Sequence, residues 1–261
     1  MEGSRVERGL RHDRLLVIAG LLAVVALSWA YLLAGAGTLQ DMGGMLMPMS
    51  SGPWTLGHAA LMLVMWVVMM AAMMLPSAAP MVLLYTTIAR GRRANGGRAA
   101  GSGAFGLGYI VIWSAFSMGA VALQFGLEKI AMLSPMMEAT SVVLVAVILI
   151  AAGLYQWTPL KQACLRHCRS PLEFVLTYWR NGVWGAFVMG IRHGVYCVGC
   201  CWLLMLLLFV GGVMNLVWIA GIALFILVEK LAPAGHWAGR GMGVLLMAWG
   251  VATLLRAEVL V

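Results

Sequence analysis

The sequence predicts an all-α fold, a polytopic transmembrane helix bundle of about six or seven spans with a cytoplasmic N-terminus. Of its 261 residues, 63% are hydrophobic and only 10% are charged, which is far from the balance of a domain that folds in water. Apolar runs of 18 or more residues recur along the chain, and each is long enough to cross roughly 30 Å of hydrocarbon as a helix. Basic residues gather in alternate loops. We therefore expect one membrane domain and no soluble domain.

The predicted spans follow a basic tail, 1–14, within a single domain over 15–261. The first span, 15–37, is expected to be retained, because its apolar core is long for a signal peptide and no small-residue cleavage site is clearly placed. The second span, 56–89, contains Pro76 and Pro80, and a proline kinks a helix because it removes a backbone hydrogen bond. The other spans are expected at 104–126, 136–156, 183–211, 214–231 and 242–256, the last being short for a full crossing.

Lysine and arginine indicate the orientation, because basic loops resist translocation and mark the cytoplasmic side. The intervening segments 38–55, 127–135 and 211–214 carry one lysine between them. The cations assigned to cytoplasmic segments are Arg5, Arg8, Arg11, Arg14, Arg90, Arg92, Arg93, Arg98, Lys161, Arg166, Arg169, Arg180, Lys230 and Arg240. The net charge of +8 thus follows from topology, and we expect a lipid bilayer and no nucleic acid as a partner.

One predicted helix carries the strongest candidate site. Its donors are His193, Cys197, Cys200 and Cys201. They are three or four residues apart, so they share one helix face. An imidazole and up to three thiolates are soft ligands that suit Cu(I), zinc or an iron-sulfur centre. Each cysteine alone is also a common small core residue, so packing is the alternative.

A cysteine pair, Cys164 and Cys168, precedes that helix. If the segment between Pro159 and Pro171 is helical, both thiols point the same way, whereas His167 points off their face. The topology puts the pair on the cytoplasmic side, where thiols stay reduced. A composite site from loop and helix is therefore expected, and a surface cysteine pair is the alternative.

Glu229 is a further candidate ligand near the cytoplasmic end of the sixth span. A buried, unpaired carboxylate would be costly there. We therefore expect a partner, which is either Lys230 or Arg192 in an ion pair, or else a metal or a proton step.

Two groups of methionines are candidates for metal uptake, among 21 methionines in all. Thioethers bind Cu(I) without losing a proton, so a loop could collect copper and a helix could conduct it. The loop group is Met42, Met45, Met47 and Met49, followed by His58, and the helical row is Met62, Met65, Met69 and Met73. A membrane-dipping loop and flexible core packing are the alternatives.

Three separated segments carry a resemblance that covers most of the chain. They read WVVMMAAMMLPSAAPM at 66–81, TPLKQACLRHCRSP at 158–171 and GVYCVGCCW at 194–202. They resemble the signatures of a bacterial family of predicted metal-binding integral membrane proteins of unknown function. The resemblance implies a multi-pass protein of the bacterial inner membrane, with a metal site at Cys164, Cys168, Cys197, Cys200 and Cys201. It implies no reaction and no substrate.

Three classes of function stay open at this point. The first is binding or transport of a soft metal, with copper preferred to zinc or iron, which implies a partner metal-binding protein in the membrane or on the exoplasmic side. The second is a membrane-embedded enzyme that uses the metal or thiol redox chemistry. The third is a structural or assembly subunit without a metal. Whether the chain is an enzyme, and its oligomeric state, are left open.

Overall fold

The computed structural model describes residues 2–36, 39–41, 46–48, 54–94, 96–97 and 100–259, with the backbone alone for 2–14, 39–41, 46–48 and 258–259. The elements are α1 (Glu2–Leu33), β1 (Leu39–Asp41), β2 (Leu46–Pro48), α2 (Leu56–Ala94), α3 (Ser102–Lys129), α4 (Val142–Tyr155), α5 (Pro159–Arg169), α6 (Pro171–Tyr178), α7 (Gly182–Leu206), α8 (Leu208–Gly211), α9 (Leu216–Leu231) and α10 (Gly235–Val259). The helical class is confirmed, and the two short strands pair antiparallel.

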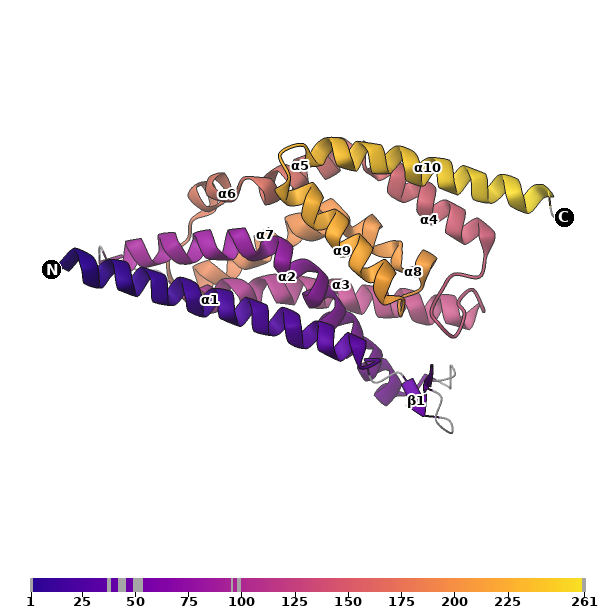
Figure 1. The fold of residues 1–261 in the computed structure, drawn as a ribbon, viewed down its shortest axis with the longest axis horizontal. Helices are drawn as coiled ribbons and strands as arrows, with labels where there is room; N and C mark the ends of the chain where they lie inside the picture. The colour runs from indigo at the N-terminus through magenta and orange to yellow at the C-terminus, as the bar shows by residue number, and fades with distance from the viewer. Residues whose placement is uncertain are drawn as a thin grey trace.

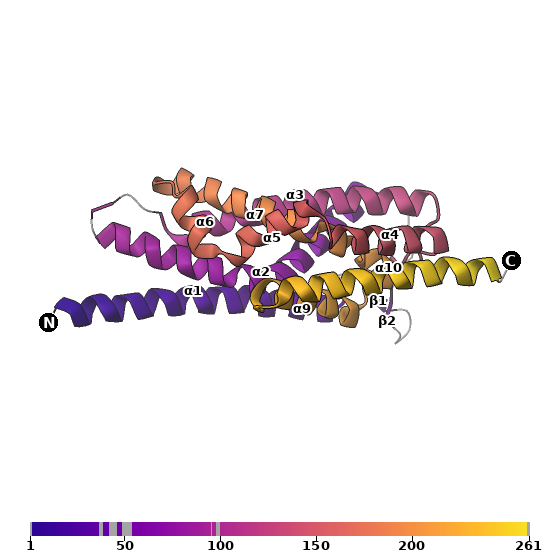
Figure 2. The ribbon, with the colours of Figure 1, turned by 90° about the horizontal axis from the view of Figure 1, so that it is seen from above.

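The helices form an elongated bundle (Figure 1). In one part α1 lies along α2, which packs on α3, and α3 packs on α7; in the other part α4 lies along α10. The short helix α9 contacts both α2 and α10 and so joins the two parts. The two ends of the chain lie at opposite ends of the bundle, and β1 and β2 lie away from the N-terminal end (Figures 1 and 2).

Five helical segments are long and apolar enough to cross a membrane, against the six or seven predicted. They cover 15–33, 56–93, 102–129, 182–211 and 235–257. Helices α4 and α5 meet the same criterion only as a pair, and the pair bends by 64° at its break. Helix α9 has 16 residues, which is short of the roughly 20 that a crossing requires. By length and composition, the described residues thus contain five such segments, or six if the bent pair is one span.

Several boundaries differ from those expected. Helix α1 begins at Glu2, so the basic tail continues into the first apolar segment as one helix. The expected spans 136–156 and 214–231 begin later, at Val142 and Leu216, whereas the expected span 242–256 begins earlier, at Gly235. Hydropathy could not set these boundaries, because the loops beside them are themselves apolar.

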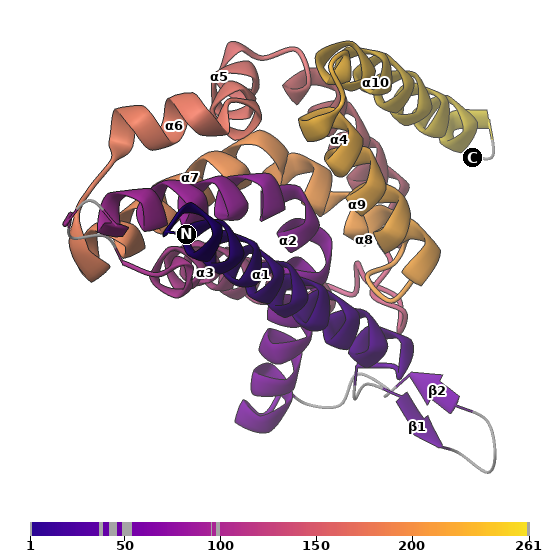
Figure 3. The ribbon, with the colours of Figure 1, turned by 60° about the vertical axis from the view of Figure 1, so that its left-hand side comes forward.

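Helix α2 runs through Pro76 and Pro80 as one element, and its ribbon changes direction along its length (Figure 3). Side-chain donors supplement the backbone hydrogen bonds beside the prolines. The carbonyl oxygen of Met74 accepts hydrogen bonds from the Ser77 hydroxyl at 2.9 Å and from the Tyr109 hydroxyl at 3.3 Å. The helix thus stays continuous through both prolines, although it bends and neither proline can donate a backbone hydrogen bond.

Two glycines allow α3 and α7 to approach closely. A Cβ atom added at Gly108 would collide with the carbonyl oxygen of Phe187, and one added at Gly190 would collide with that of Phe105. Both obstacles are helix backbone, which cannot turn aside as a side chain can. This contact fixes α7, which carries three of the cysteines, against α3.

We expect Gly108→Ala to lower the free energy of unfolding by about 1–3 kcal/mol, because an extra methyl group forces the two backbones apart. Thermal unfolding in detergent measures the effect. Gly106→Ala is the matched control, since nothing lies within 4 Å of a Cβ atom added there. Equal melting temperatures for the two variants would contradict the close contact.

Candidate metal centre

Helix α7 presents three thiols inside the bundle. Cys197, Cys200 and Cys201 are all buried, and all five cysteines of the chain are free. The thiols of Cys200 and Cys201 each donate a hydrogen bond to the carbonyl oxygen of Cys197, at 3.0 Å. The three therefore gather around one turn, as their spacing predicts.

Helix α5 brings a fourth thiol to this turn. It begins at Pro159, behind a Thr158 cap whose side chain accepts from the Lys161 backbone N–H, and it ends at Arg169, so the segment between the two prolines is helical as predicted. The thiol of Cys168 packs against the core cluster that contains Cys197 and Cys200, within range of electrostatic interaction with their sulfurs. Sulfur atoms from two separate helices thus meet at one place within the bundle.

Cys164 lies one turn earlier on α5 and faces a different part of α7. A Cβ atom added at Gly199 would lie 2.7 Å from its sulfur atom. The missing side chain of Gly199 therefore makes the room that Cys164 fills. Cys164 acts as a packing contact between α5 and α7, beside the sulfur cluster formed by Cys168, Cys197, Cys200 and Cys201.

A lysine lies in the middle of this sulfur cluster. The ammonium of Lys230, on α9, is 3.0 Å from the sulfur of Cys197 and 3.1 Å from the hydroxyl of Ser77, and the residue is only 4% exposed. Lys230 was counted with a basic cytoplasmic segment at the end of the sixth span, whereas the structure turns its side chain inward from α9. The cluster consequently carries a fixed positive charge beside its thiols.

His193 and Tyr109 complete one side of the cluster. The hydroxyl of Tyr109 lies 3.1 Å from the sulfur of Cys197, and its ring stacks on the His193 imidazole with 5.6 Å between centroids. His193 also contacts Phe105 and Phe174. Among the described residues, Nδ1 of His193 has no hydrogen-bond partner. The imidazole is thus packed among aromatic rings one turn from Cys197, with a nitrogen uncommitted.

The predicted methionine row is buried and leads toward the cluster. Met62, Met65, Met69 and Met73 all lie in the main hydrophobic core. Their neighbour Met74 reaches the cluster, where its sulfur accepts a hydrogen bond from Cys201 at 3.9 Å. A thioether therefore adjoins the thiols at the end of the row.

In the described part of the chain, no three His, Cys, Asp or Glu side chains are arranged to hold a metal ion as they stand. Two of the thiols donate to the Cys197 carbonyl, and the Lys230 ammonium lies 3.0 Å from the Cys197 sulfur. Metal binding would exchange these S–H bonds for metal–sulfur bonds and would release protons.

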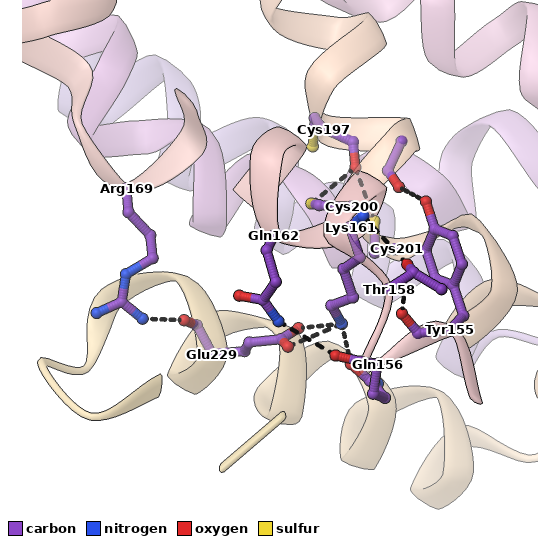
Figure 4. A network of polar contacts seen from close by, with 11 residues as sticks. Tyr155, Gln156, Thr158, Lys161, Gln162, Arg169, Cys197, Cys200, Cys201 and Glu229 are labelled. Atoms are coloured by element: carbon purple, nitrogen blue, oxygen red, sulfur yellow. Dashed lines mark hydrogen bonds and ion pairs between the residues drawn. The ribbon is translucent and has the colours of Figure 1, made fainter. Parts of the chain in front are cut away.

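Glu229 belongs to a separate ion pair, shown in Figure 4. Its carboxylate lies 2.7 Å from the ammonium of Lys161, which also contacts the side-chain oxygen of Gln156. The two partners expected from the sequence lie elsewhere. Lys230 donates a hydrogen bond to Cys197, and Arg192 lies over the ring of Tyr178. Lys161 was placed in a loop, but it is 0% exposed, because α5 folds back into the bundle.

Arg169, at the end of α5, binds the end of α9 beside this ion pair. Its guanidinium donates to the carbonyl oxygens of Glu229, Ala232 and Pro233 at 2.7, 2.7 and 2.8 Å. These groups end α9, where the last carbonyls lack helical partners. The end of α5 therefore holds α9 in place, and with it Lys230.

We expect Lys161→Met to lower the free energy of unfolding by about 3–5 kcal/mol, because it leaves a buried carboxylate without its counter-charge. The double variant Lys161→Met/Glu229→Leu should recover most of this loss, since an apolar pair needs no compensation. Thermal unfolding measures both. If the double variant is as unstable as the single one, the ion pair is not the source of the effect.

Most of the predicted uptake loop lies outside what the structure describes. Met42, Met45 and Met49 are outside the described residues, and Met47 lies in β2, where only the backbone is described. His58 lies against the ring of Trp54, with 5.0 Å between centroids. The Trp54 indole in turn donates to Glu128 at 2.7 Å.

Sequence reasoning missed several residues of the site, namely Tyr109, Ser77, Lys161 and Lys230 as buried partners. Lys230 had one available signal, since it stands beside Glu229 at the end of an apolar helix. Tyr109 had none, because an aromatic residue in an apolar segment is ordinary. Only the packing of α3 and α9 on α7 brings these groups to the thiols.

Comparison with known protein families gives a match over most of the chain. The model of the PpoB2 family, described as a copper chaperone, matches residues 63–253. No curated protein matches, and no solved structure matches. The matched stretch contains all five cysteines, Lys230 and most of the methionine row.

Proposed function

Because the chain belongs to the PpoB2 family of copper chaperones, we propose that it holds Cu(I) on sulfur ligands inside a membrane-embedded helix bundle and passes it to a partner protein. The ligands are Cys168 from α5 with Cys197 and Cys200 from α7. The observation that carries the proposal is that these three thiols lie together in the core although they come from two separate helices.

The donor set favours copper over zinc or iron. Cu(I) selects thiolate and thioether ligands, and the cluster offers both, since Met74 adjoins Cys201. Structural zinc sites are closed sets of four ligands. The nearest carboxylate, that of Glu229, is engaged by Lys161 and is therefore kept out of the donor set. His193, one turn from Cys197, and Cys201, which adjoins Met74, remain secondary candidates.

The outer surface supports membrane insertion. Large apolar side chains point outward around the bundle, for example Leu27 (70% exposed), Val217 (83%) and Leu245 (64%) from α1, α9 and α10. Leaving so much apolar area in water is unfavourable. We place the protein in the bacterial inner membrane, with the N-terminus and the arginine-rich segments on the cytoplasmic side.

The buried methionines of α2 give the copper a route. Met62 and Met74 are about 18 Å apart along the helix, and thioethers at helical spacing lie between them. Because thioethers bind Cu(I) without losing a proton, such a row can pass the ion through a medium where charge is costly. We assign α2 the transfer path and the sulfur cluster the holding site.

The test is anaerobic titration of the detergent-purified protein with Cu(I) in competition with a chromogenic Cu(I) chelator. We expect the protein to retain copper against the chelator and to retain no Zn(II) under the same conditions. Cys168→Ser should lose most of this copper, whereas Cys164→Ser, the matched control on the same helix, should keep it. A wild-type protein that retains no copper would disprove the proposal.

A further inference from the structure

A second cluster of soft ligands lies near the start of α2, around the side chain of Gln124. Its amide nitrogen is 3.5 Å from the sulfur of Met62, 3.4 Å from the sulfur of Met137 and 2.8 Å from a carboxylate oxygen of Glu128. An amide nitrogen carries two hydrogens, yet three acceptors converge on it. They define a point surrounded by two thioethers and a negative charge.

The orientation of the amide is fixed by its neighbours. The Trp66 indole N–H donates to the oxygen of Gln124 at 2.8 Å, so the nitrogen must be the atom that faces the two sulfurs. Gln124, Met62 and Trp66 are all buried. Glu128 is anchored in turn by the Trp54 indole, beside which His58 lies. Glu128 and Met137 are half-buried, so the cluster lies at the edge of the core.

Met137 has a strained backbone conformation that directs its side chain toward Gln124. Met137 has φ of 56°, in the left-handed region that costs a residue with a side chain about 1–3 kcal/mol. A tight turn holds it there: its N–H donates to the Ser134 carbonyl, and the Ser134 N–H donates to the Glu138 carbonyl, both at 2.8 Å. The result is that the loop between α3 and α4 directs a thioether into the bundle.

From these contacts we propose that Met62, Met137 and Glu128 form a second cation site, which accepts a soft monovalent ion, Cu(I) or its analogue Ag(I), at the position of the Gln124 amide. The two thioethers supply soft ligands that need no deprotonation, and the carboxylate balances the charge. Gln124 would turn aside on binding. The inference rests on the proposed function for the identity of the cargo, and it assigns this end of α2 as the point of copper uptake.

Silver ion is a suitable probe, because Ag(I) shares the ligand preference of Cu(I) and does not cycle between oxidation states. Silver nitrate is titrated into detergent-purified protein, and bound silver is counted by elemental analysis after gel filtration. We compare wild type with Met62→Leu/Met137→Leu, with Cys197→Ser/Cys200→Ser, and with the control Met118→Leu/Met136→Leu. The control replaces two methionines that are 55% and 46% exposed by the same residue.

We expect the Met62→Leu/Met137→Leu variant to bind Ag(I) roughly 10- to 100-fold more weakly at one class of sites, while the silver held by the cysteines remains. The control variant should match wild type. Glu128→Gln keeps an oxygen for the Trp54 indole and should weaken the same class about tenfold, which gives a second readout if the methionine variant folds poorly. If both the methionine variant and Glu128→Gln bind silver as wild type does, the inference is wrong.

The cysteine variant separates this inference from the proposed function. Loss of the tight class in Cys197→Ser/Cys200→Ser, with the weaker class intact, supports both. If the cysteine variant keeps every silver ion while the methionine variant loses one class, the sulfur cluster is not a holding site but the second site stands.

Discussion

Cys197→Ser/Cys200→Ser should abolish retention of Cu(I) against a competing chelator, with a loss of about one Cu(I) per chain. These two thiols are the α7 partners of Cys168, so the variant leaves at most one thiol of the three. A hydroxyl is a hard, weakly acidic donor and does not replace a thiolate for Cu(I). The measurement is the copper-to-protein ratio after anaerobic loading and gel filtration.

Folding should survive this change, which keeps the result interpretable. Serine is slightly smaller than cysteine, and its hydroxyl at position 200 can still donate to the carbonyl oxygen of residue 197, as the thiol does at 3.0 Å. Circular dichroism and thermal unfolding of the two proteins therefore serve as the control. A well-folded variant that keeps its copper would remove α7 from the holding site.

Lys230→Met should weaken Cu(I) binding by about 100-fold. A copper ion held by two or three thiolates leaves a net negative charge, and Lys230 lies 3.0 Å from one of the ligands. Attraction between opposite charges 4 Å apart is worth about 4 kcal/mol at an effective dielectric constant of about 20. Loss of roughly 3 kcal/mol of this attraction raises the Kd about 100-fold. Competition titration with the chelator measures the change.

Lys129→Met is the matched control, because Lys129 is exposed at the end of α3, and it should bind copper as wild type does. The sign of the Lys230 effect is informative. If Lys230→Met binds copper more tightly than wild type, the ammonium competes with the ion for Cys197 instead of balancing the charge of the complex.

The spacing of residues in the sequence predicted the face of α7 correctly, because three- and four-residue intervals fix which side chains share a side. It also predicted the helix that carries Cys164 and Cys168, since a proline at each end bounds it. It could not tell which of the two joins the sulfur cluster. That depends on Gly199, whose missing side chain admits Cys164 and so sets the depth of α5.

Charge gave the most misleading signal. Lys161 and Lys230 stand at the edges of apolar segments, where a lysine is ordinarily in a loop, yet each has a buried partner on another helix. Burial of a charge depends on a partner distant in sequence, and no local pattern reveals it. The position of Met137 was equally hidden in the sequence. Met137 reaches the second cluster because its own backbone is left-handed, and the loop around it has an ordinary composition.

The family assignment refines the resemblance found in the sequence. The motifs pointed to metal-binding proteins of unknown function, and the matching family is described as a copper chaperone over 63–253. The preference for copper over zinc and iron came from the sulfur-rich donors, because ligand softness is a property of residue type. It needed no knowledge of the fold.

The bend after α4 has a consequence for the surrounding lipid. Helix α4 has 14 residues and is therefore about 21 Å long, several ångströms short of an ordinary hydrocarbon layer. If the bundle lies in a membrane as proposed, the bilayer at this corner would become thinner or admit water, because α5 turns away by 64° and carries Arg166 and Arg169. Such local thinning would bring water close to Cys168. An ion released on that side would then cross only a short distance of hydrocarbon.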